Sequence, residues 1–475
     1  MLMQCGLCFS KDRKGIVHVR KGTDVSLLKK PNTIYVFEQD HHIDNNWVVP
    51  NNCTLEFRGG TISGGLIYGS GTNIVSDSAR FVIGSIVKGS WSVSGWMPEW
   101  FKPDTSEYWN SALQKCMDLS GSTGRPVVLT GDLYMLDNYE RTAPTKANPE
   151  PDCYNSLLNI CSGMTIISRN NSKVKVKPLP MHAGRYYTAV FGHRYEGCND
   201  YPSTKTLKDI TFDGITIDNY DDSLAEAPSA PIINKYCIYG YNVSNLTVQN
   251  CSLYCSGSNC LFMDVAYKRG GVRSYEGIAE NCVIRNNYFR IKEKQYPYDL
   301  SALFVAIENT EIHDNVIEHH YRDEARDRWG CAGIEIHAGS FKVFNNKVIG
   351  FHNGINDCNY VGPTKGIHDI YGNEFDDCSA PLALWSFGSP KMFSALNGVS
   401  FHDNVCRQCR QPVRSNATDQ GMKDIKVYKN TFYCETVRGG AVSFSKIENG
   451  LDISFSGNTF YHANPTPFFE FQAQS

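Results

Sequence analysis

Polar and aromatic residues stand at equivalent places in a series of short apolar segments of this chain. The segments read CLFMDVAY from Cys260, ALFVAIEN from Ala302, GIEIHAG from Gly333, GINDCN from Gly354, PLALWSF from Pro381, PVRSNA from Pro412 and AVSFSK from Ala441. Because side chains alternate along a strand, inward Leu261, Leu303, Ile334, Ile355, Leu382, Val413 and Val442 would leave outward Phe262, Asp264, Glu335, His337, Asn356, Trp385, Arg414 and Asn416. Hydrogen-bonding groups beside aromatic rings are what a sugar-binding groove needs.

Hydrolysis of a glycosidic bond is the chemistry that two of these carboxyl groups would perform. Neighbouring strands of a solenoid lie about 4.8 Å apart, so Asp264 and His337, two strands apart in one register, would stand roughly 10 Å apart, with Glu335 diagonal to Asp264. Carboxyl groups separated by roughly 6.5 to 9.5 Å suit an inverting glycosidase. We therefore predict Glu335 and Asp264 as the acid and base. The loop acids that could complete the pair instead are Asp323, Glu324 and Asp327.

The remaining residues of this face are predicted to hold the substrate. His337 and Arg414 would position it and Trp385 would stack on a sugar ring. Further hydrogen-bond partners would be Asn356, Asn416 and Glu308. The alternative for any single one of them is ordinary solvation, because a solenoid must present polar side chains to water.

Elimination from a uronate is the alternative chemistry. It needs a base for the C5 proton and either Ca²⁺ or an arginine to stabilise the developing carboxylate charge. Arg414 and the acidic segment DNYDDS from Asp218 are candidates for those roles. Calcium is expected only for a lyase, and no cofactor is expected otherwise. No metal site is predicted from Cys5-x-x-Cys8 and Cys406-x-x-Cys409, since these half-sites of zinc spacing lie about 400 residues apart.

A repeated phrase indicates the fold that must position these residues. Between Leu207 and Phe460 the pattern apolar-x-x-Asn-x-apolar returns with a period of roughly 30 residues, which signals a solenoid. Its alternating apolar residues predict coils of short β-strands, hence an all-β parallel β-helix. Asn tolerates left-handed backbone geometry and can bond to the same residue one coil away. A stacked asparagine ladder is therefore predicted from Asn287, Asn315, Asn346, Asn373, Asn404, Asn430 and Asn458.

The rest of the chain divides into three predicted parts. Residues 1–32 form a lead or attachment segment, residues 33–98 form a small β domain or the irregular first coils, and residues 99–475 form the β-helix. An amphipathic helix at about 105–120 is expected to cap the solenoid core. Long insertions are expected to gather on one face and build its binding surface. They cover residues 137–155, 180–206, 218–235 and 319–331.

The opening of the predicted β-helix resembles that of the pectate-lyase-like, right-handed parallel β-helix superfamily. The resemblance rests on a helix followed by PVVLTGDLYML from Pro126 and LLNICSGMTIISRNNSKVKV from Leu157. Asp104-Thr105 occupies the position of the superfamily's Asp-Asp-Thr motif. The segment from Gly131 to Tyr134 occupies the position of its Pro-Gly-x-Tyr turn. The segments before it are similar to those of tail-spike-type proteins from gut Bacteroidetes and their phages. The resemblance covers most of residues 33–475.

The resemblance implies right-handed coiling and a carbohydrate substrate, but no particular reaction. The chain lacks the Asp-x-Asp and Arg-x-Pro-x-x-Arg arrangements of calcium lyases and the ordered Asn-Thr-Asp and Gly-His-Gly of polygalacturonases. The apolar C-terminal segment PFFEFQAQS favours self-association, and the similarity to tail spikes implies a homotrimer.

Composition and charge limit the kinds of partner and the cellular location that we expect for this chain. A net charge of −3 with both signs interspersed indicates no nucleic acid, and no apolar run reaches the roughly 18 residues of a membrane span. The N-terminus has no recognisable signal peptide. The 18 cysteines fall largely within the repeats, which favours buried free thiols.

These observations predict an extracellular, cell-surface or virion-associated β-helix that binds a polysaccharide and cleaves it, with hydrolysis favoured over elimination. The alternative is a non-catalytic adhesin or phage tail protein that only binds glycan.

Overall fold

The computed structural model falls into two compact units, Met1–Val128 and Leu129–Ser475. It describes residues 15–76, 84–103, 105–137, 156–178, 186–193, 206–222, 233–264, 267–268, 272–273, 279–294, 300–337, 339–358, 366–386, 395–418, 420–435, 442–445, 450–462 and 469–472. The predicted insertions 137–155, 180–206 and 218–235 lie largely outside these residues.

The second unit is built from three parallel sheets, which we call sheets I, II and III, although the first two residues of β9 (Val127–Leu129) precede this unit. In the described residues each has 11 strands. Sheet I comprises β9 (Val127–Leu129), β12 (Thr165–Ser168), β15 (Leu207–Asp213), β18 (Val243–Gln249), β23 (Glu280–Arg285), β26 (Glu308–His313), β29 (Phe341–Phe344), β32 (His368–Tyr371), β35 (Leu396–His402), β38 (Met422–Tyr428) and β41 (Leu451–Ser456).

The other two sheets follow in the same chain order. Sheet II comprises β10 (Leu133–Leu136), β13 (Lys173–Val176), β16 (Thr216–Asn219), β19 (Ser252–Cys255), β24 (Tyr288–Ile291), β27 (Val316–His319), β30 (Lys347–Ile349), β33 (Glu374–Asp376), β36 (Val405–Cys409), β39 (Thr431–Cys434) and β42 (Thr459–His462). Sheet III comprises β11 (Leu158–Asn159), β14 (Tyr186–Gly192), β17 (Ile233–Tyr241), β20 (Asn259–Asp264), β25 (Leu300–Val305), β28 (Cys331–His337), β31 (Asn353–Cys358), β34 (Ala380–Ser386), β37 (Val413–Thr418), β40 (Val442–Ser445) and β43 (Phe469–Gln472).

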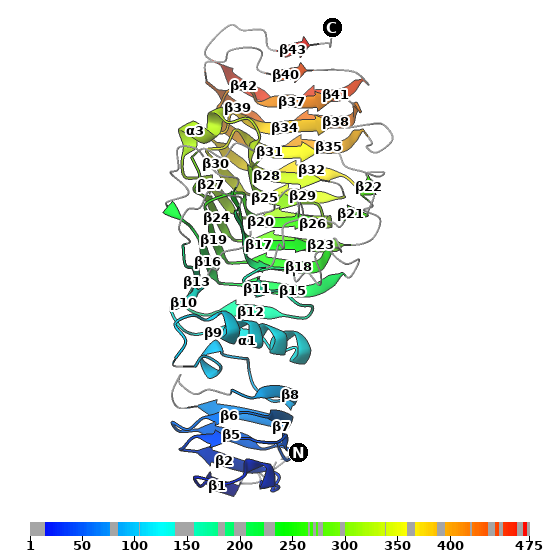
Figure 1. Cartoon of the computed structure of the whole chain (residues 1–475). Helices are drawn as coiled ribbons and strands as arrows, with labels where there is room; N and C mark the ends of the chain where they lie inside the picture. The colour runs from blue at the N-terminus through cyan, green and yellow to red at the C-terminus, as the bar shows by residue number, and fades with distance from the viewer. Residues whose placement is uncertain are drawn as a thin grey trace, which may run out of the picture. The chain divides into compact units, whose positions relative to one another are not determined.

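One strand of each sheet makes a coil, and the coils stack (Figure 1). This is the predicted parallel β-helix, in which each strand pairs with its equivalent one coil earlier and later. The α-helix α3 (Arg322–Asp327) follows β27 within the predicted insertion 319–331, and β21 (Tyr267–Lys268) and β22 (Val272–Arg273) form an antiparallel pair.

The predicted asparagine ladder is confirmed. From Asn287 to Asn458, each side-chain Nδ2 donates to Oδ1 of the next ladder asparagine at 2.9–3.0 Å. That Oδ1 also accepts a hydrogen bond from the backbone N–H of the same neighbour, so the buried corner has its polar atoms paired. The left-handed backbone belongs to the residue before each ladder asparagine, such as Asn345 with φ 56°, and not to the ladder asparagine itself.

The inward positions predicted for sheet III are also confirmed. They pair with one another from strand to strand and none is exposed. The residues are Leu261, Leu303, Ile334, Ile355, Leu382, Val413 and Val442.

The strict alternation breaks near the start of these strands. A Cβ on Gly333 would lie 2.4 Å from Val348 Cγ1, and one on Gly354 would lie 2.5 Å from Phe375 Cδ1, so both glycines face the interior beside inward Ile334 and Ile355. Two consecutive interior positions turn the residue before them outward. Asn353 is therefore on the outer face, where alternation alone would have placed it inside.

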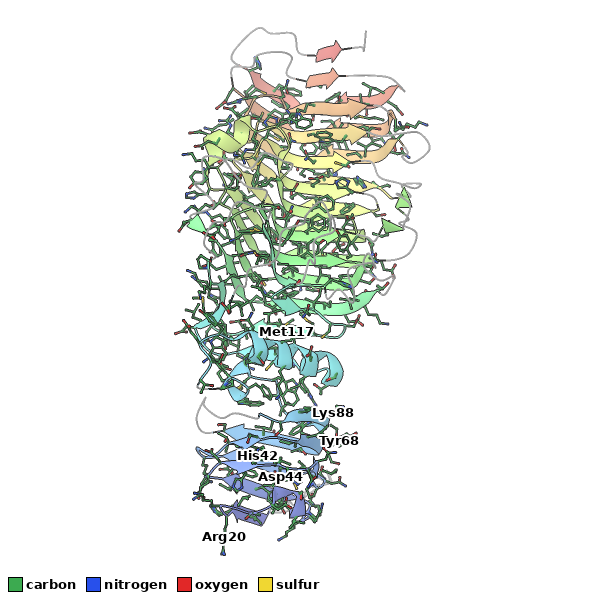
Figure 2. All side chains as sticks on the ribbon, viewed as in Figure 1. Arg20, His42, Asp44, Tyr68, Lys88 and Met117 are labelled. Carbon is green, nitrogen blue, oxygen red and sulfur yellow. The ribbon has the colours of Figure 1, made fainter. Side chains whose placement is uncertain are left out.

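The first unit has its own core. Its parallel sheet contains β1 (Gly15–Val19), β2 (Thr33–Phe37), β4 (Trp47–Val48), β5 (Thr54–Phe57), β7 (Leu66–Ser76) and β8 (Ile86–Trp91). Outside it, β3 (His41–His42) pairs with β6 (Ile62–Ser63), also in parallel. Tyr68 of β7 and Lys88 of β8 are register partners (Figure 2). Because β1 pairs with β2, this sheet begins before residue 33, where the sequence analysis placed its start.

The predicted helix is α1 (Asn110–Thr123), which follows the 3-10 turn Pro98–Trp100 and ends at Gly124 with φ 65°. Leu113, Cys116 and Met117 are buried, as its amphipathic pattern predicts. The helix belongs to the compact unit that ends at Val128, whereas the sequence analysis grouped it with residues 99–475. Its role as a cap stays a prediction.

Candidate functional site

The candidate site lies on the outer face of sheet III, across five consecutive strands. One column of outward residues there pairs in register from β25 to β37. Its members are Phe304, Glu335, Asn356, Ala383 and Arg414. Four rung spacings of about 4.8 Å give this column a length of about 19 Å.

Glu335 is the centre of the site. Its Oε1 accepts a hydrogen bond from His337 Nε2 at 2.6 Å, and its Oε2 accepts one from the hydroxyl of Ser301 on the preceding strand. Burial opposes ionisation of this carboxyl, but the hydrogen bond and charge of His337, with hydrogen bonds from Ser301 and Asn356, outweigh it and lower the pKa of Glu335 below its ordinary value. Glu335 is therefore ionised at neutral pH.

A continuous set of hydrogen bonds joins Glu335 to the following strands. Asn356, a partner of Glu335, accepts from Asn353 Nδ2 at 2.6 Å and from Trp385 Nε1 at 3.3 Å. Arg414 Nη2 in turn donates to Asn353 Oδ1 at 2.6 Å. The structure thus brings together five of the predicted site residues, and it adds Ser301 and Asn353, which the alternation rule had hidden.

These outward side chains are more buried than solvation alone would make them. Relative exposure is 4% for His337, 4% for Asn356 and 9% for Arg414. Such burial of polar groups is favourable only when they are paired with one another or with a ligand. The cluster is therefore organised, in contrast to a face that merely meets water.

An aromatic column adjoins the polar cluster. Tyr239, Phe262 and Phe304 stack face to face with ring centroids 5.2 and 4.5 Å apart, and the Phe304 ring lies 4.7 Å from that of His337. Because the two faces of Phe262 are occupied by its neighbours, it cannot serve as a plate for a sugar ring. Trp385 lies next to the cluster and contacts Trp329 edge to face, with centroids 5.2 Å apart.

Trp329 is a site residue that the sequence analysis missed. It follows α3 in the insertion 319–331 and is 59% exposed, the highest exposure of a tryptophan among the described residues. A large exposed apolar side chain beside a polar cluster is a typical binding element. The available signal was the single Trp in this insertion.

Arginines anchor α3 against the coils. Arg326 contacts Asp377 at 2.5 Å, Glu435 at 2.7 Å and the carbonyl of Gln408 at 3.0 Å. Arg410 pairs with Asp327 from the other side. The insertion that carries Trp329 is thus fixed to β36 and to the residues that directly follow β33, β36 and β39.

The other predicted residues lie apart from this cluster. Asp264 is on sheet III, 2% exposed, in register with Tyr241 and two strands before β28. Glu308 begins β26 in sheet I and accepts from the Ser340 hydroxyl at 3.1 Å. Asp323 is exposed in the first turn of α3. Asn416 lies in β37, and its side chain falls outside the described residues.

One group of donor atoms within the described residues could hold a metal. Glu335, His337 and Cys358 each offer one atom, and the three atoms lie within 4.8 Å of one another. A carboxylate, an imidazole and a thiol suit Zn²⁺ and not Ca²⁺, which prefers oxygen ligands. His337 Nε2 donates a hydrogen bond to Glu335 Oε1 at 2.6 Å, so this nitrogen would have to lose its proton before it could bind an ion together with that oxygen.

Two further features of the described residues concern the cysteines and the helices. All 14 described cysteines are free of disulfides, and 12 of them are buried, as expected for thiols within the repeats. No helix found there is both long enough and apolar enough to cross a lipid bilayer.

Comparisons with known proteins identify the fold. Three solved structures of variants of the tailspike protein of E. coli bacteriophage HK620, each in complex with a pentasaccharide, match 79% of this chain with TM-scores of 0.52, 0.54 and 0.53. Sequence identity is 13–14%, and the chain spans 62–63% of the length of those tailspike chains. The fold is the right-handed parallel β-helix. No protein-family model and no curated protein sequence matches.

Proposed function

We propose that this chain, a right-handed parallel β-helix with the fold of a phage tailspike, binds a polysaccharide along the outer face of sheet III. The observation that carries the proposal is the hydrogen-bonded series from Glu335 through Asn356 and Asn353 to Arg414, with Trp385 and Trp329 beside it. Amides, charged groups and aromatic rings along an extended face match the hydroxyls and ring faces of successive sugars.

The fold comparison supports this ligand class. The tailspike structures of similar fold hold a pentasaccharide, which is a ligand of the class that this face would bind. A virion-associated or cell-surface location and a homotrimer go with this proposal. Sedimentation velocity tests the trimer.

Hydrolysis is the reaction we propose for the site. The ionised Glu335 would act as base toward water, and Asp264, on the same sheet two strands earlier, would protonate the leaving oxygen. Two rung spacings amount to about 10 Å before the side chains extend, close to the roughly 6.5–9.5 Å of an inverting glycosidase. His337, which donates to Glu335 Oε1, would hold the carboxylate in place. Asp323 on the nearby insertion remains the alternative acid.

A binding-only function is the second candidate, and one observation favours it. Both carboxylate oxygens of Glu335 already accept hydrogen bonds from this chain, one from His337 and one from Ser301. A carboxylate held in this way could serve only to orient Asn356 and the binding face. The chain would then be an adhesin or a phage tail protein without turnover.

One assay separates these functions. The purified chain is incubated with acidic and neutral plant, host and bacterial-capsule polysaccharides, and reducing ends, unsaturated products and binding are followed. Reducing ends without unsaturated products mean hydrolysis, whereas unsaturated products mean elimination and direct attention to Arg414 and a calcium ion. Binding without products selects the adhesin or tail protein, and no binding to any polysaccharide refutes the proposed function.

A further inference from the structure

Arg414 occupies an unusual position in the candidate site. It stands on β37, and its guanidinium reaches past the rung of β34 to bond Asn353 on β31. The two outward positions of β34 in these columns are Ala380 and Ala383, the register partners of Asn353 and Asn356. Their small side chains leave the space in which the guanidinium lies.

Among the described residues, this guanidinium is buried without a directly paired counter-charge. Arg414 is 9% exposed, and within the described residues no Asp or Glu forms an ion pair with it and no group accepts from its Nε–H. Burial lowers the pKa of Arg414 to about 10. A buried, unpaired charge is costly and is retained where a ligand supplies the opposite charge.

The titratable groups near Arg414 do not directly neutralise its positive charge. Burial, and next the positive charge of Arg414, lower the pKa of His352 to about 4, so that imidazole is neutral. Its Nδ1 lies 2.5 Å from the carbonyl oxygen of Arg326 and donates to it.

The acids of this region have other direct partners. Glu335 accepts from His337 and Ser301, and among the described residues it is linked to Arg414 through Asn356 and Asn353. Asp377 and Glu435 pair with Arg326, and Asp327 pairs with Arg410.

We propose that Arg414 binds the carboxylate of an acidic sugar, so that the polysaccharide recognised by this face carries uronic or other carboxylate-bearing residues. The inference rests on the proposed function and narrows its substrate class. A guanidinium matches a carboxylate because its planar N–H groups can make two parallel hydrogen bonds to the two oxygens. Asn353 Oδ1 fixes the plane of the fork, and Trp385 with Asn356 lies alongside for the sugar ring.

The test compares each acidic polysaccharide with its own carboxyl-reduced form. Binding is measured to immobilised polygalacturonate, alginate, hyaluronan and polysialic acid. Each is tested before and after its carboxylates are reduced to alcohols. Dextran and xylan are the neutral polysaccharides for comparison. We expect an acidic form to bind and its reduction to weaken binding roughly 30-fold or more, as for loss of one partner of a buried charge pair. Equal binding of both forms, or binding of neutral polysaccharides alone, overturns the inference and leaves the proposed function standing.

Variants assign the effect to this side chain. Arg414→Gln should weaken binding of the acidic form much more than binding of the reduced form, so that the difference between the two forms disappears. Arg414→Lys keeps the charge but loses the fork, so it should recover only part of the affinity. Arg407→Gln is the matched control, since Arg407 is exposed on sheet II and lies over the Tyr433 ring, and it should change nothing.

A second measurement is independent of any polysaccharide. Sodium glucuronate should raise the thermal midpoint of the wild type relative to sodium chloride of equal ionic strength, and it should not raise that of Arg414→Gln. Arg414→Met should keep or raise the midpoint in chloride, because it removes an unpaired buried charge. A lowered midpoint for Arg414→Met, or no glucuronate effect on the wild type, overturns the inference even where no polysaccharide binds.

Discussion

The carboxylate of Asp357 and the imidazole of His368 lie 2.8 Å apart with neither side chain exposed to solvent. Asp357 stands on β31 in register with Ile336 and Leu384. His368 begins β32 and donates its other ring nitrogen, Nε2, to the carbonyl of Gly339 at 2.9 Å. An ion pair thus joins sheets I and III through the solenoid interior, directly behind the outward cluster of Glu335 and Asn356.

This pair predicts a large and pH-dependent effect of Asp357→Asn. Loss of one partner leaves the other buried and unpaired, so the free energy of unfolding should fall by about 3–5 kcal/mol. Burial alone would lower the pKa of His368, but the charge and hydrogen bond of Asp357, with the Gly339 carbonyl, raise it above 6.5. A raised histidine pKa stabilises the fold fully below the unfolded value of about 6.5, and this stabilisation is lost as pH rises through the folded value.

Thermal midpoints of wild type and Asp357→Asn from pH 5 to 9 provide the measurement. The difference should be largest at the acid end and should shrink as pH rises. Asp369→Asn is the control, because its pair with His402 at 3.0 Å is partly exposed and should matter little. The double variant Asp357→Leu/His368→Leu should recover most of the lost stability. A difference that grows with pH would contradict the assignment of a protonated His368.

The carboxylate of Glu335 predicts the behaviour of the proposed reaction. Glu335→Gln should reduce turnover by about 10²–10⁴, the contribution of general base catalysis. Polysaccharide binding should be retained, because Gln keeps the shape of the side chain: its oxygen can accept from His337 Nε2 and its amide N–H can donate to the Ser301 hydroxyl. The lowered pKa means that the base stays ionised until the pH falls below its ordinary 4.5. The acid limb of the pH–rate profile should therefore lie below that value.

The matched control for this variant is Glu311→Gln on sheet I, whose carboxylate pairs with Lys342 at 2.9 Å at the surface. It should leave turnover and binding unchanged. Unchanged turnover in Glu335→Gln would remove Glu335 from the mechanism. Turnover should also be lost in either Asp264→Asn or Asp323→Asn, and the variant that loses it identifies the acid.

The asparagine ladder predicts a graded loss of stability. Asn373→Ala removes the acceptor of the Asn346 N–H and Nδ2 and the donor to the Val343 carbonyl, all in the buried corner. An unsatisfied buried group costs about 1–3 kcal/mol, so the thermal midpoint should fall clearly. Asn458→Ala, at the partly exposed end of the ladder, should cost less. Equal losses at both positions would argue against a cooperative ladder.

The ladder and the inward column were predictable because both repeat at every coil. Leu303, Ile334 and Ile355 obey strand alternation, and Asn346 or Asn373 recurs with the coil period. The left-handed residue was misplaced by one position, because Asn, Asp, Lys and Gly all occupy it, as at Asn345 and Lys429, and no single letter marks it in the sequence.

The site was predictable only where alternation holds. Glu335, His337, Asn356 and Arg414 follow it, whereas Asn353 escapes it because Gly354 faces the interior out of turn. Trp329 could not be predicted by alternation for a different reason, because it lies in an insertion that does not repeat from coil to coil. The path of this insertion over the coils is fixed by long-range pairs such as Arg326 with Asp377. Glu308 was predicted as a further hydrogen-bond partner on this face, but the chain has already turned into sheet I there.

The anchoring of α3 predicts that Arg326 controls the position of Trp329. Arg326→Ala leaves Asp377 and Glu435 without their shared cation, and the α3 insertion should open locally while the coils stay folded. Hydrogen exchange at residues 320–331 should accelerate, with little change in the rest of the second unit. Arg407→Ala, which loses only a surface contact with Tyr433, is the control.

Polysaccharide binding should depend on the position of the α3 insertion, which carries Trp329. Trp329→Ala should weaken binding by about 2 kcal/mol, roughly 30-fold, because an exposed tryptophan at a binding face typically contributes as a hot spot. Arg326→Ala should weaken it to a similar degree, and the double variant should be no weaker than either single variant, because both act through the same ring. Tyr461→Ala, which removes an exposed aromatic on sheet II, should leave binding intact. Additive losses would mean that Arg326 contributes to binding by some route other than the placement of Trp329.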